Sequence, residues 1–183
     1  MIPDFLVGNS PVKTGIIWHF TAGGTLSGAR ATLAKLDKVN VLCMIDKDGT
    51  RHMLMEEDQW AYHTGMGKSW CSVTFGVEFV NWGPLTFEKG LYLPWTKSTR
   101  HAVPEDKVAP CAFRGYRFYE RLTLEQRQSA LELSLDLQTR HPLVFEKTHA
   151  DINPKKLDFP PDFPGLNEFM VLSIVTGWIY HTQ

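Results

Sequence analysis

Two histidines and one aspartate are the strongest candidates for metal chemistry in this sequence. His19 ends an apolar stretch and is followed by small residues, whereas His149 and Asp158 lie nine residues apart on a proline-rich loop far downstream. Two imidazoles and one carboxylate can bind zinc and leave a fourth coordination position open, as catalytic zinc sites do. We therefore predict one Zn2+ ion held by His19, His149 and Asp158.

The spacing alone leaves this ligand set open. Asp158 could equally be a surface carboxylate, and no periodicity in the sequence brings His19 close to it. Lone histidines are usually structural, and we assign that role to His52, His101, His141 and His181.

Glu78 is the candidate acid–base group. It lies in the alternating run from Val73 to Val80, on the face that also carries Thr74 and Gly76. A carboxylate on so apolar a strand is unfavourable unless it is hydrogen-bonded, paired or functional. Burial raises the pKa of a carboxyl group, which could then take a proton from water and give it to a leaving nitrogen. A structural bridge to an arginine is the alternative interpretation.

Lys156 precedes the predicted ligand Asp158 by two residues. A cation at this place could stabilise the oxyanion of a tetrahedral intermediate. Most lysines on loops have no such function. Nucleophilic and phosphate-binding alternatives lack support, because the chain has no Gly-x-Ser-x-Gly turn and no phosphate-binding glycine loop.

The elements that must position these residues follow from hydrophobic periodicity. Strands are predicted at 14–20, 39–46, 50–55, 73–80 and 143–147, and helices at 27–36, 123–139 and 166–183. A glycine-, proline- and aromatic-rich segment, 82–118, is expected to form a long surface excursion, used for packing or for sugar contacts. Strands mixed with helices indicate an α/β (mixed α+β) fold with a central mixed sheet flanked by helices.

Size and composition indicate one domain spanning residues 1–183. The 183 residues are 43% hydrophobic and carry a formal net charge of -1, with no strongly basic tract, so a nucleic-acid partner is not expected. No apolar run is long enough for membrane insertion, and the N-terminus lacks the features of a signal peptide. We expect a cytoplasmic monomer. Three cysteines without a pairing motif predict thiols rather than a disulfide framework.

Five motifs occur in an order that resembles the type 2 N-acetylmuramoyl-L-alanine amidases, a family that includes phage endolysins, wall-recycling amidases and peptidoglycan recognition proteins. The resemblance covers about residues 14–165. The motifs are Trp18-His19-Phe20-Thr21-Ala22-Gly23, Ile45-Asp46-Lys47-Asp48-Gly49-Thr50, Ala61-Tyr62-His63-Thr64-Gly65, Phe75-Gly76-Val77-Glu78-Phe79 and the run from His149 to Asp158.

This resemblance implies a zinc enzyme that cuts the amide between the lactyl group of N-acetylmuramic acid and L-alanine of the peptidoglycan stem peptide. It implies His19, His149 and Asp158 as metal ligands and Glu78 and Lys156 as catalytic groups. His63, which follows Trp60, matches a position lining the substrate groove. Asn81 is a further candidate for a peptide contact.

Two departures from the family pattern affect these expectations. Val41-Leu42 replaces a Tyr-His pair found in many members, so the tyrosine used by one branch is missing and Glu78 must do its work. Asp158-Phe159-Pro160 replaces the usual Asp-Pro-Gly. The segment around Phe113-Arg114-Gly115-Tyr116 resembles phage members, which predicts an endolysin that reaches the wall of its host bacterium after membrane breach. A cytosolic recycling amidase and a non-catalytic peptidoglycan-binding module remain alternatives.

Overall fold

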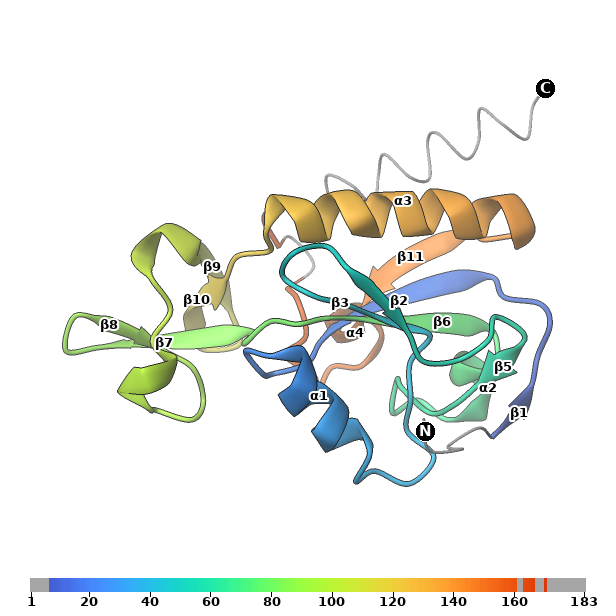
Figure 1. Ribbon diagram of the computed structural model, residues 1–183, viewed down its shortest axis with the longest axis horizontal. Coiled ribbons are helices and arrows are strands. Elements are labelled where there is room, and N and C mark those ends of the chain that lie inside the picture. The colour runs from blue at the N-terminus through green and yellow to red at the C-terminus, as the bar shows by residue number, and fades with distance from the viewer. Residues whose placement is uncertain (1–6, 161–162, 167–169, 171–183) are drawn as a thin grey trace.

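The computed structural model describes residues 7–160, 163–166 and 170. The helix predicted at 166–183 lies almost wholly outside the described residues. Within them, the chain forms a central sheet covered by helices on both faces, with a second, smaller sheet projecting from one end (Figure 1).

The central sheet is mixed, as predicted. Its strand order is β11-β2-β6-β3-β4, in which β4 runs antiparallel to β3 and the other neighbours are parallel. The bounds are β2 Gly15–Phe20, β3 Cys43–Ile45, β4 Arg51–Met53, β6 Thr74–Phe79 and β11 Phe145–Thr148. The predicted strand at 39–46 is therefore shorter than expected, whereas the hairpin that follows it is confirmed.

Helix α3, Leu124–Arg140, covers one face of this sheet (Figure 1). It begins with the predicted capping box, in which the Thr123 side chain accepts from the Gln126 backbone N–H and Gln126 reaches back. The core beneath it contains the alternate apolar residues of β2 and β6, such as Trp18 and Val77, both fully buried. The period of two therefore directs His19 and Glu78 to the opposite face.

Helix α1, Leu26–Leu33, packs on that opposite face. Its N-cap is Thr25, whose hydroxyl accepts from the Gly28 N–H, so the helix begins one residue before the predicted start at residue 27. The remaining short elements are β1 Gly8–Asn9, β5 Gln59–Trp60, α2 Lys68–Cys71, α4 His149–Ile152, and the 3-10 turns Thr99–His101 and Glu105–Lys107. Cys43 and Cys71 are buried thiols.

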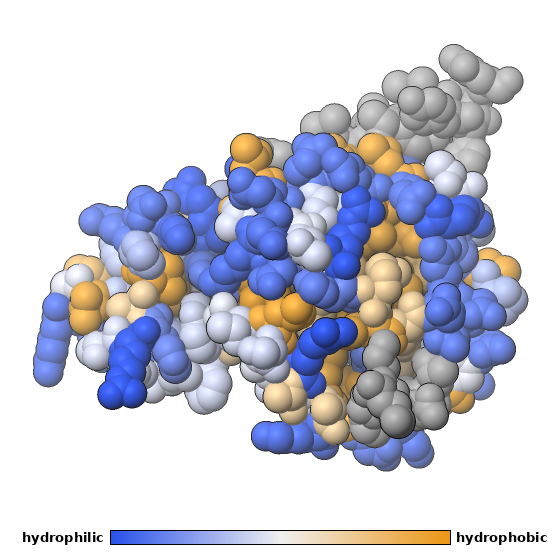
Figure 2. All heavy atoms as spheres, viewed as in Figure 1, coloured by the Kyte–Doolittle hydropathy of each residue, from blue (hydrophilic) through white to orange (hydrophobic). Residues whose placement is uncertain are grey.

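The segment 82–118 is more regular than predicted. It forms a four-stranded antiparallel sheet of order β8-β7-β10-β9, which we call the projecting sheet. Its strands are β7 Pro84–Glu88, β8 Leu91–Leu93, β9 Val108–Phe113 and β10 Tyr116–Glu120. Figure 2 shows hydrophobic and hydrophilic residues side by side on its surface, at the left of the view.

Two tight turns explain this regularity. Lys89-Gly90 joins β7 to β8 and Arg114-Gly115 joins β9 to β10, and all four residues have positive φ. Positive φ at both central residues is the conformation of a type I′ hairpin turn, whose twist matches the twist of the strands. Neither turn has the Asn-Gly or Asp-Gly dipeptide that usually marks such a hairpin, so the two hairpins were not predicted from the sequence.

Glu120 attaches the projecting sheet to the central sheet. Its carboxylate is buried and accepts from the Trp82 backbone N–H at 2.6 Å and from Lys47 Nζ at 2.5 Å. Charge-assisted hydrogen bonds of this kind are stronger than neutral ones. Glu120 therefore links the segment that leaves the central sheet at Trp82 to the segment that returns to it.

No helix in the described ranges is long and apolar enough to cross a bilayer.

We expect Gly83 at this junction to be much less replaceable than Gly90. Both have positive φ, but a side chain at Gly83 would collide with the Phe20 ring, whereas the space around Gly90 is open. Gly90→Ala should cost about 1 kcal/mol for the backbone conformation, and Gly83→Ala should cost about 1–3 kcal/mol more from overpacking. Urea unfolding measures both values; equal losses would contradict the junction packing.

Candidate metal and catalytic site

Parallel pairing brings the candidate residues to one edge of the central sheet. Strand β2 lies between β11 and β6, with Trp18 paired to Thr148 and His19 paired to Glu78. His149 follows β11 directly, at the start of α4. The carboxyl ends of parallel strands are the usual location of ligand sites in such sheets.

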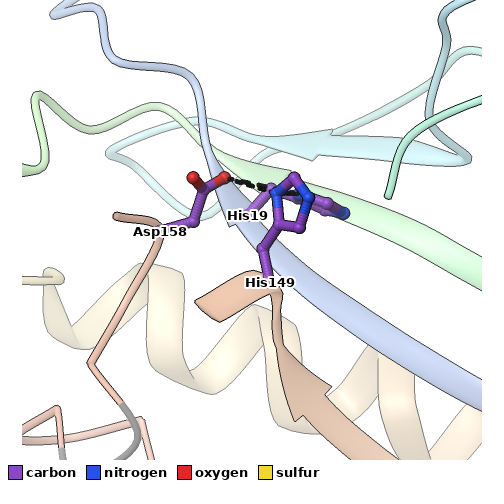
Figure 3. Close-up of side chains that lie close together, drawn as sticks. All are labelled: His19, His149 and Asp158. Carbon is purple, nitrogen blue, oxygen red and sulfur yellow. Dashed lines mark hydrogen bonds and ion pairs between the residues drawn. The ribbon is translucent and has the colours of Figure 1, made fainter. Parts of the chain in front are cut away.

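The three predicted ligands converge at this edge. His19 Nδ1 lies 2.8 Å from His149 Nδ1, and Asp158 Oδ2 lies 3.1 Å from His149 Nδ1 and 3.4 Å from His19 Nδ1. Figure 3 shows the Asp158 carboxylate, on the loop after α4, pointing at the two rings. The three atoms belong to one group that could hold a metal ion.

A backbone hydrogen bond folds the loop after α4 back on itself. The Ala150 N–H donates to the Asp158 carbonyl at 3.2 Å, which places Asp158 beside His149 although nine residues separate them. Asn153, in the same loop, donates through its amide to the Thr64 carbonyl at 3.0 Å. The geometry of the cluster thus depends on main-chain contacts that side-chain patterns do not reveal.

The Thr64 carbonyl also fixes the proton of His149. This oxygen lies 2.8 Å from His149 Nε2 and can only accept, so Nε2 carries the hydrogen. In a neutral imidazole the other ring nitrogen then has a free lone pair. The Nδ1 lone pair of His149 consequently points into the cluster.

A chain of polar contacts fixes the proton of His19 in the same way. The Thr74 hydroxyl donates to the Trp70 carbonyl at 2.8 Å and so accepts from His63 Nε2 at 3.2 Å. His63 Nδ1 is then an acceptor, and His19 Nε2 donates to it at 3.2 Å. The Nδ1 lone pair of His19 is therefore left for the cluster.

Three electron-pair donors thus face one another at close range. Burial, followed by the proximity of His149, lowers the pKa of His19 to about 4, so the ring is neutral at pH 7. Burial disfavours the charge of Asp158, and hydrogen bonds from the rings of His149 and His19 lower the pKa of its carboxyl. These contacts are attractive only when a proton, or a cation in its place, lies between the Nδ1 atoms and Asp158 Oδ2. A divalent cation relieves the resulting repulsion. The donor atoms of tetrahedral zinc lie about 3.3 Å apart, close to the separations here.

Glu78 lies beside this cluster on the same face as His19. Burial and, to a smaller extent, the charge of Asp158 raise the pKa of its carboxyl to about 8, although the charge of Lys156 opposes the rise. In the described part of the chain, no residue donates a hydrogen bond to this carboxylate, and no arginine bridges to it. The alternative interpretation of Glu78 as half of a structural ion pair therefore has no support.

Lys156 supplies the positive charge of the site. Its side chain is partly buried, and its charge lowers the pKa of both His19 and Glu78. The Lys156 carbonyl accepts from Arg114 Nη1, at the tip of the projecting sheet. The loop that carries Lys156 is therefore held from outside as well as by its own turn.

His63 fills the space beside Gly76 and contacts His19. A side chain at Gly76 would meet the ring of His63 at 2.8 Å, so this glycine makes room for that ring. His63 Nδ1 lies 3.2 Å from His19 Nε2, so His63 orients a predicted metal ligand. Its expected place in the substrate groove stays a prediction.

Trp60 and Asn81 are both buried, and their side chains contact other parts of the protein. Trp60 is 4% exposed and packs edge-on against Tyr62. Asn81 is 1% exposed, and its amide is engaged at both ends, accepting from the Gly83 N–H and donating to the Glu120 carbonyl. In the structure Trp60 packs against Tyr62 and Asn81 anchors the loop at Gly83, while the substrate contacts expected of both residues stay predictions.

The sequence analysis missed Thr64 and Thr74. Thr74 could have been found, because it shares the alternating face of β6 with Glu78. Thr64 acts through its carbonyl oxygen, and no side-chain pattern identifies such a role.

We expect Thr74→Val to weaken metal binding without unfolding the protein. Valine has the same shape but cannot accept from His63, so the proton positions of His63 and His19 are no longer fixed. Loss of a hydrogen-bond partner behind a ligand typically lowers metal affinity about 10–100-fold. Competition with a chromophoric chelator measures the affinity for Zn2+. Thr74→Ser, which keeps the hydroxyl, is the matched control; equal affinity of both variants would contradict the polar chain.

Comparison with solved structures identifies the same fold in peptidoglycan amidases. N-acetylmuramoyl-L-alanine amidase LysC from Clostridium intestinale URNW aligns with a TM-score of 0.59 at 16% identity, over 91% of this chain and 88% of LysC. AmiD from E. coli, in complex with anhydro-N-acetylmuramic acid-L-Ala-D-gamma-Glu-L-Lys, aligns with a TM-score of 0.56 at 19% identity. That alignment covers 84% of this chain and 54% of AmiD, so the chain spans about half the length of AmiD.

The enzyme AmpDh3 from Pseudomonas aeruginosa aligns with a TM-score of 0.55 at 17% identity, over 92% of this chain and 62% of AmpDh3. No curated protein matches the sequence. The family of N-acetylmuramoyl-L-alanine amidases does match, over residues 8–161. Since this match spans most of the chain, the protein belongs to the N-acetylmuramoyl-L-alanine amidase family, the type 2 amidases that the order of its motifs predicts.

Proposed function

We propose that the protein is a zinc-dependent amidase that cuts the bond between the lactyl group of N-acetylmuramic acid and L-alanine of the stem peptide. The observation that carries this proposal is the convergence of three lone-pair donors beside Glu78. His19, His149 and Asp158 would hold the ion. Their nitrogen and oxygen donors suit zinc, and three protein ligands are the usual number at a catalytic zinc site.

Zinc in this position supplies Lewis-acid polarisation of the scissile carbonyl and lowers the pKa of water toward 7. The protein supplies the proton transfers. Glu78 accepts a proton from the water that adds to the lactyl carbonyl carbon. It then gives this proton to the alanine nitrogen as the carbon–nitrogen bond breaks, leaving a carboxylic acid and an amine, which ionise at neutral pH to a carboxylate and an ammonium group. A carboxyl whose pKa lies near the working pH can perform both transfers.

Lys156 completes the mechanism by stabilising negative charge. Negative charge develops on the carbonyl oxygen when water adds. The Lys156 ammonium is close enough to Glu78 for its charge to lower the pKa of that carboxyl, so it can also stabilise the new negative charge. Removing one stabilising donor from such an oxyanion costs roughly 3–4 kcal/mol where it has been measured. Lys156 is therefore assigned to charge stabilisation, and Glu78 to proton transfer.

The biological role we propose is that of a phage endolysin, made in the cytoplasm of the host and acting on its wall after membrane breach. The support is the likeness to LysC, which matches this chain in length as well as fold, and a second similar structure is titled an endolysin. Recycling of soluble muropeptides is the second candidate, favoured by the likeness to AmiD in its complex with a muropeptide. Comparing rates on intact sacculi and on soluble anhydro-muropeptides separates these roles: a strong preference for the soluble substrate would overturn the endolysin assignment.

Chelation is expected to abolish activity, and Zn2+ is expected to restore it. On purified wall, activity should appear as new amino groups of L-alanine, with no new reducing sugar ends. Glu78→Gln should retain Zn2+ but lose about 100-fold or more in kcat, because a proton transfer group contributes 10²–10⁴-fold. Release of reducing ends would contradict the bond assignment, and full activity of Glu78→Gln would contradict the mechanism.

Glu78 should also give the metal-free protein a distinctive dependence of stability on pH. The pKa of its carboxyl rises from an ordinary value of 4.5 to about 8 in the folded protein, mainly through burial. Between these values the folded chain binds more protons than the unfolded chain, so the free energy of unfolding must fall as pH rises. Glu78→Gln should lack this decline. Urea unfolding in chelator from pH 4.5 to 8 measures both curves, and parallel curves would refute the burial of charge.

A further inference from the structure

Trp95 has the most exposed aromatic side chain in the described part of the chain, at 67% of its surface. It lies in the turn from Pro94 to Lys97, which the Lys97 N–H closes by donating to the Pro94 carbonyl at 2.9 Å. An indole left largely in water forgoes the burial of its apolar surface, which a ligand on its face would supply.

The indole is nevertheless held in one place. Trp95 Nε1 donates to the Ala22 carbonyl at 2.7 Å. Its neighbour Thr96 contacts His101 Nδ1 at 3.1 Å, and the His101 ring stacks on Trp82 with centroids 5.0 Å apart. The polar edge of the indole is thus satisfied, and its aromatic faces are what remains for a ligand.

The loop that anchors Trp95 is the loop of the candidate site. Ala22 lies three residues after His19. The Thr21 N–H donates to the Phe79 carbonyl at 3.0 Å, and the Gly23 N–H donates to the Asn81 carbonyl at 3.2 Å. This loop therefore begins where the strands carrying His19 and Glu78 end, and Trp95 lies on it.

The projecting sheet also reaches the other side of the site. Arg114, in the turn between β9 and β10, donates to the Lys156 carbonyl. The sheet thus contacts both loops that carry metal-site residues: one follows His19 and the other leads to Asp158. The projecting sheet therefore lies beside the candidate site, with the exposed indole of Trp95 at its edge.

We propose that Trp95 is a binding subsite for a sugar ring of the glycan strand, next to the muramyl residue whose lactyl amide is cut. This inference rests on the proposed function. A pyranose ring presents an apolar face of C–H groups and carries its hydroxyls at the edge, so it matches a flat aromatic surface in water. The ring next to a muramyl residue in the strand is N-acetylglucosamine, which is uncharged and therefore suits an indole that offers no ion partner and no spare donor.

Binding to peptide-free glycan strands tests the subsite independently of catalysis. The probe is the β-1,4-linked N-acetylglucosamine and N-acetylmuramic acid strand from which stem peptides have been removed, titrated into the zinc-loaded full chain in a calorimeter. Trp95→Ala should weaken binding about tenfold, in line with one aromatic contact. Trp95→Phe keeps an aromatic face but loses the hydrogen bond to Ala22, and should retain most of the affinity.

Phe87→Ala is the matched control, because Phe87 is 52% exposed on the same sheet and is assigned no role in binding. It should bind like the wild type. In the amidase assay, Trp95→Ala should raise KM about tenfold on substrates with several sugars, with kcat unchanged and with no effect on a muramyl peptide of one sugar.

Three results would overturn the subsite: no binding of the strands by the wild type, equal affinity of Trp95→Ala, or the same rise in KM on single-sugar substrates. The last result would indicate that Trp95 only holds the Ala22 loop. Because the peptide-free strands lack the amide between the lactyl group and L-alanine, the calorimetric result does not depend on whether the protein hydrolyses that bond.

Discussion

Parallel pairing of β2 with both β6 and β11 is the constraint on which the site depends. It sets His19 beside Glu78 in register and makes β11 end one residue before His149. His19, Glu78 and His149 come from distant parts of the sequence, yet each lies on a strand of the central sheet or directly after one. Because β2 and β6 each pack one apolar face into the core beneath α3, a shift of register by one residue would turn those side chains out of the core, so the core fixes the register of the site.

The electrostatics of the site follow from what surrounds those strand ends. Backbone carbonyls of Thr64 and Trp70 determine, directly or through His63 and Thr74, where the imidazole protons lie. A neutral His19 ring, an ionised Asp158 and a Glu78 carboxyl of raised pKa then occupy one small volume. Such opposed pKa shifts of neighbouring groups are typical of catalytic sites. Their arrangement explains why a cation would stabilise the folded protein as well as serve the reaction.

Most of the central sheet could be predicted because its strands alternate clearly. The face of His19, the face of Glu78 and the capping box of α3 all follow from local patterns, and the structure has them as predicted. The convergence of Asp158 could not follow from such patterns, because it depends on the hydrogen bond from the Ala150 N–H to the Asp158 carbonyl.

Other sequence signals were incomplete. The motif around Trp60 did not indicate that its side chain is buried. The projecting sheet was hidden because its hairpin turns use Lys-Gly and Arg-Gly at positive φ. Residues that act through main-chain atoms, such as Thr64, leave no trace in residue types, which is why the surroundings of the metal ligands were the least predictable part of the site.

The projecting sheet leaves and rejoins the central sheet at nearly the same point, since the Glu120 N–H donates to the Gly83 carbonyl and the Asn81 amide donates to the Glu120 carbonyl. Neighbouring attachment points mean that this lobe can change in length or be exchanged without disturbing the strands on either side of the junction. The glycan recognition that we propose for Trp95 is thereby separable in evolution from the candidate site: a related chain could change the projecting sheet while His19, His149, Asp158 and Glu78 keep their positions.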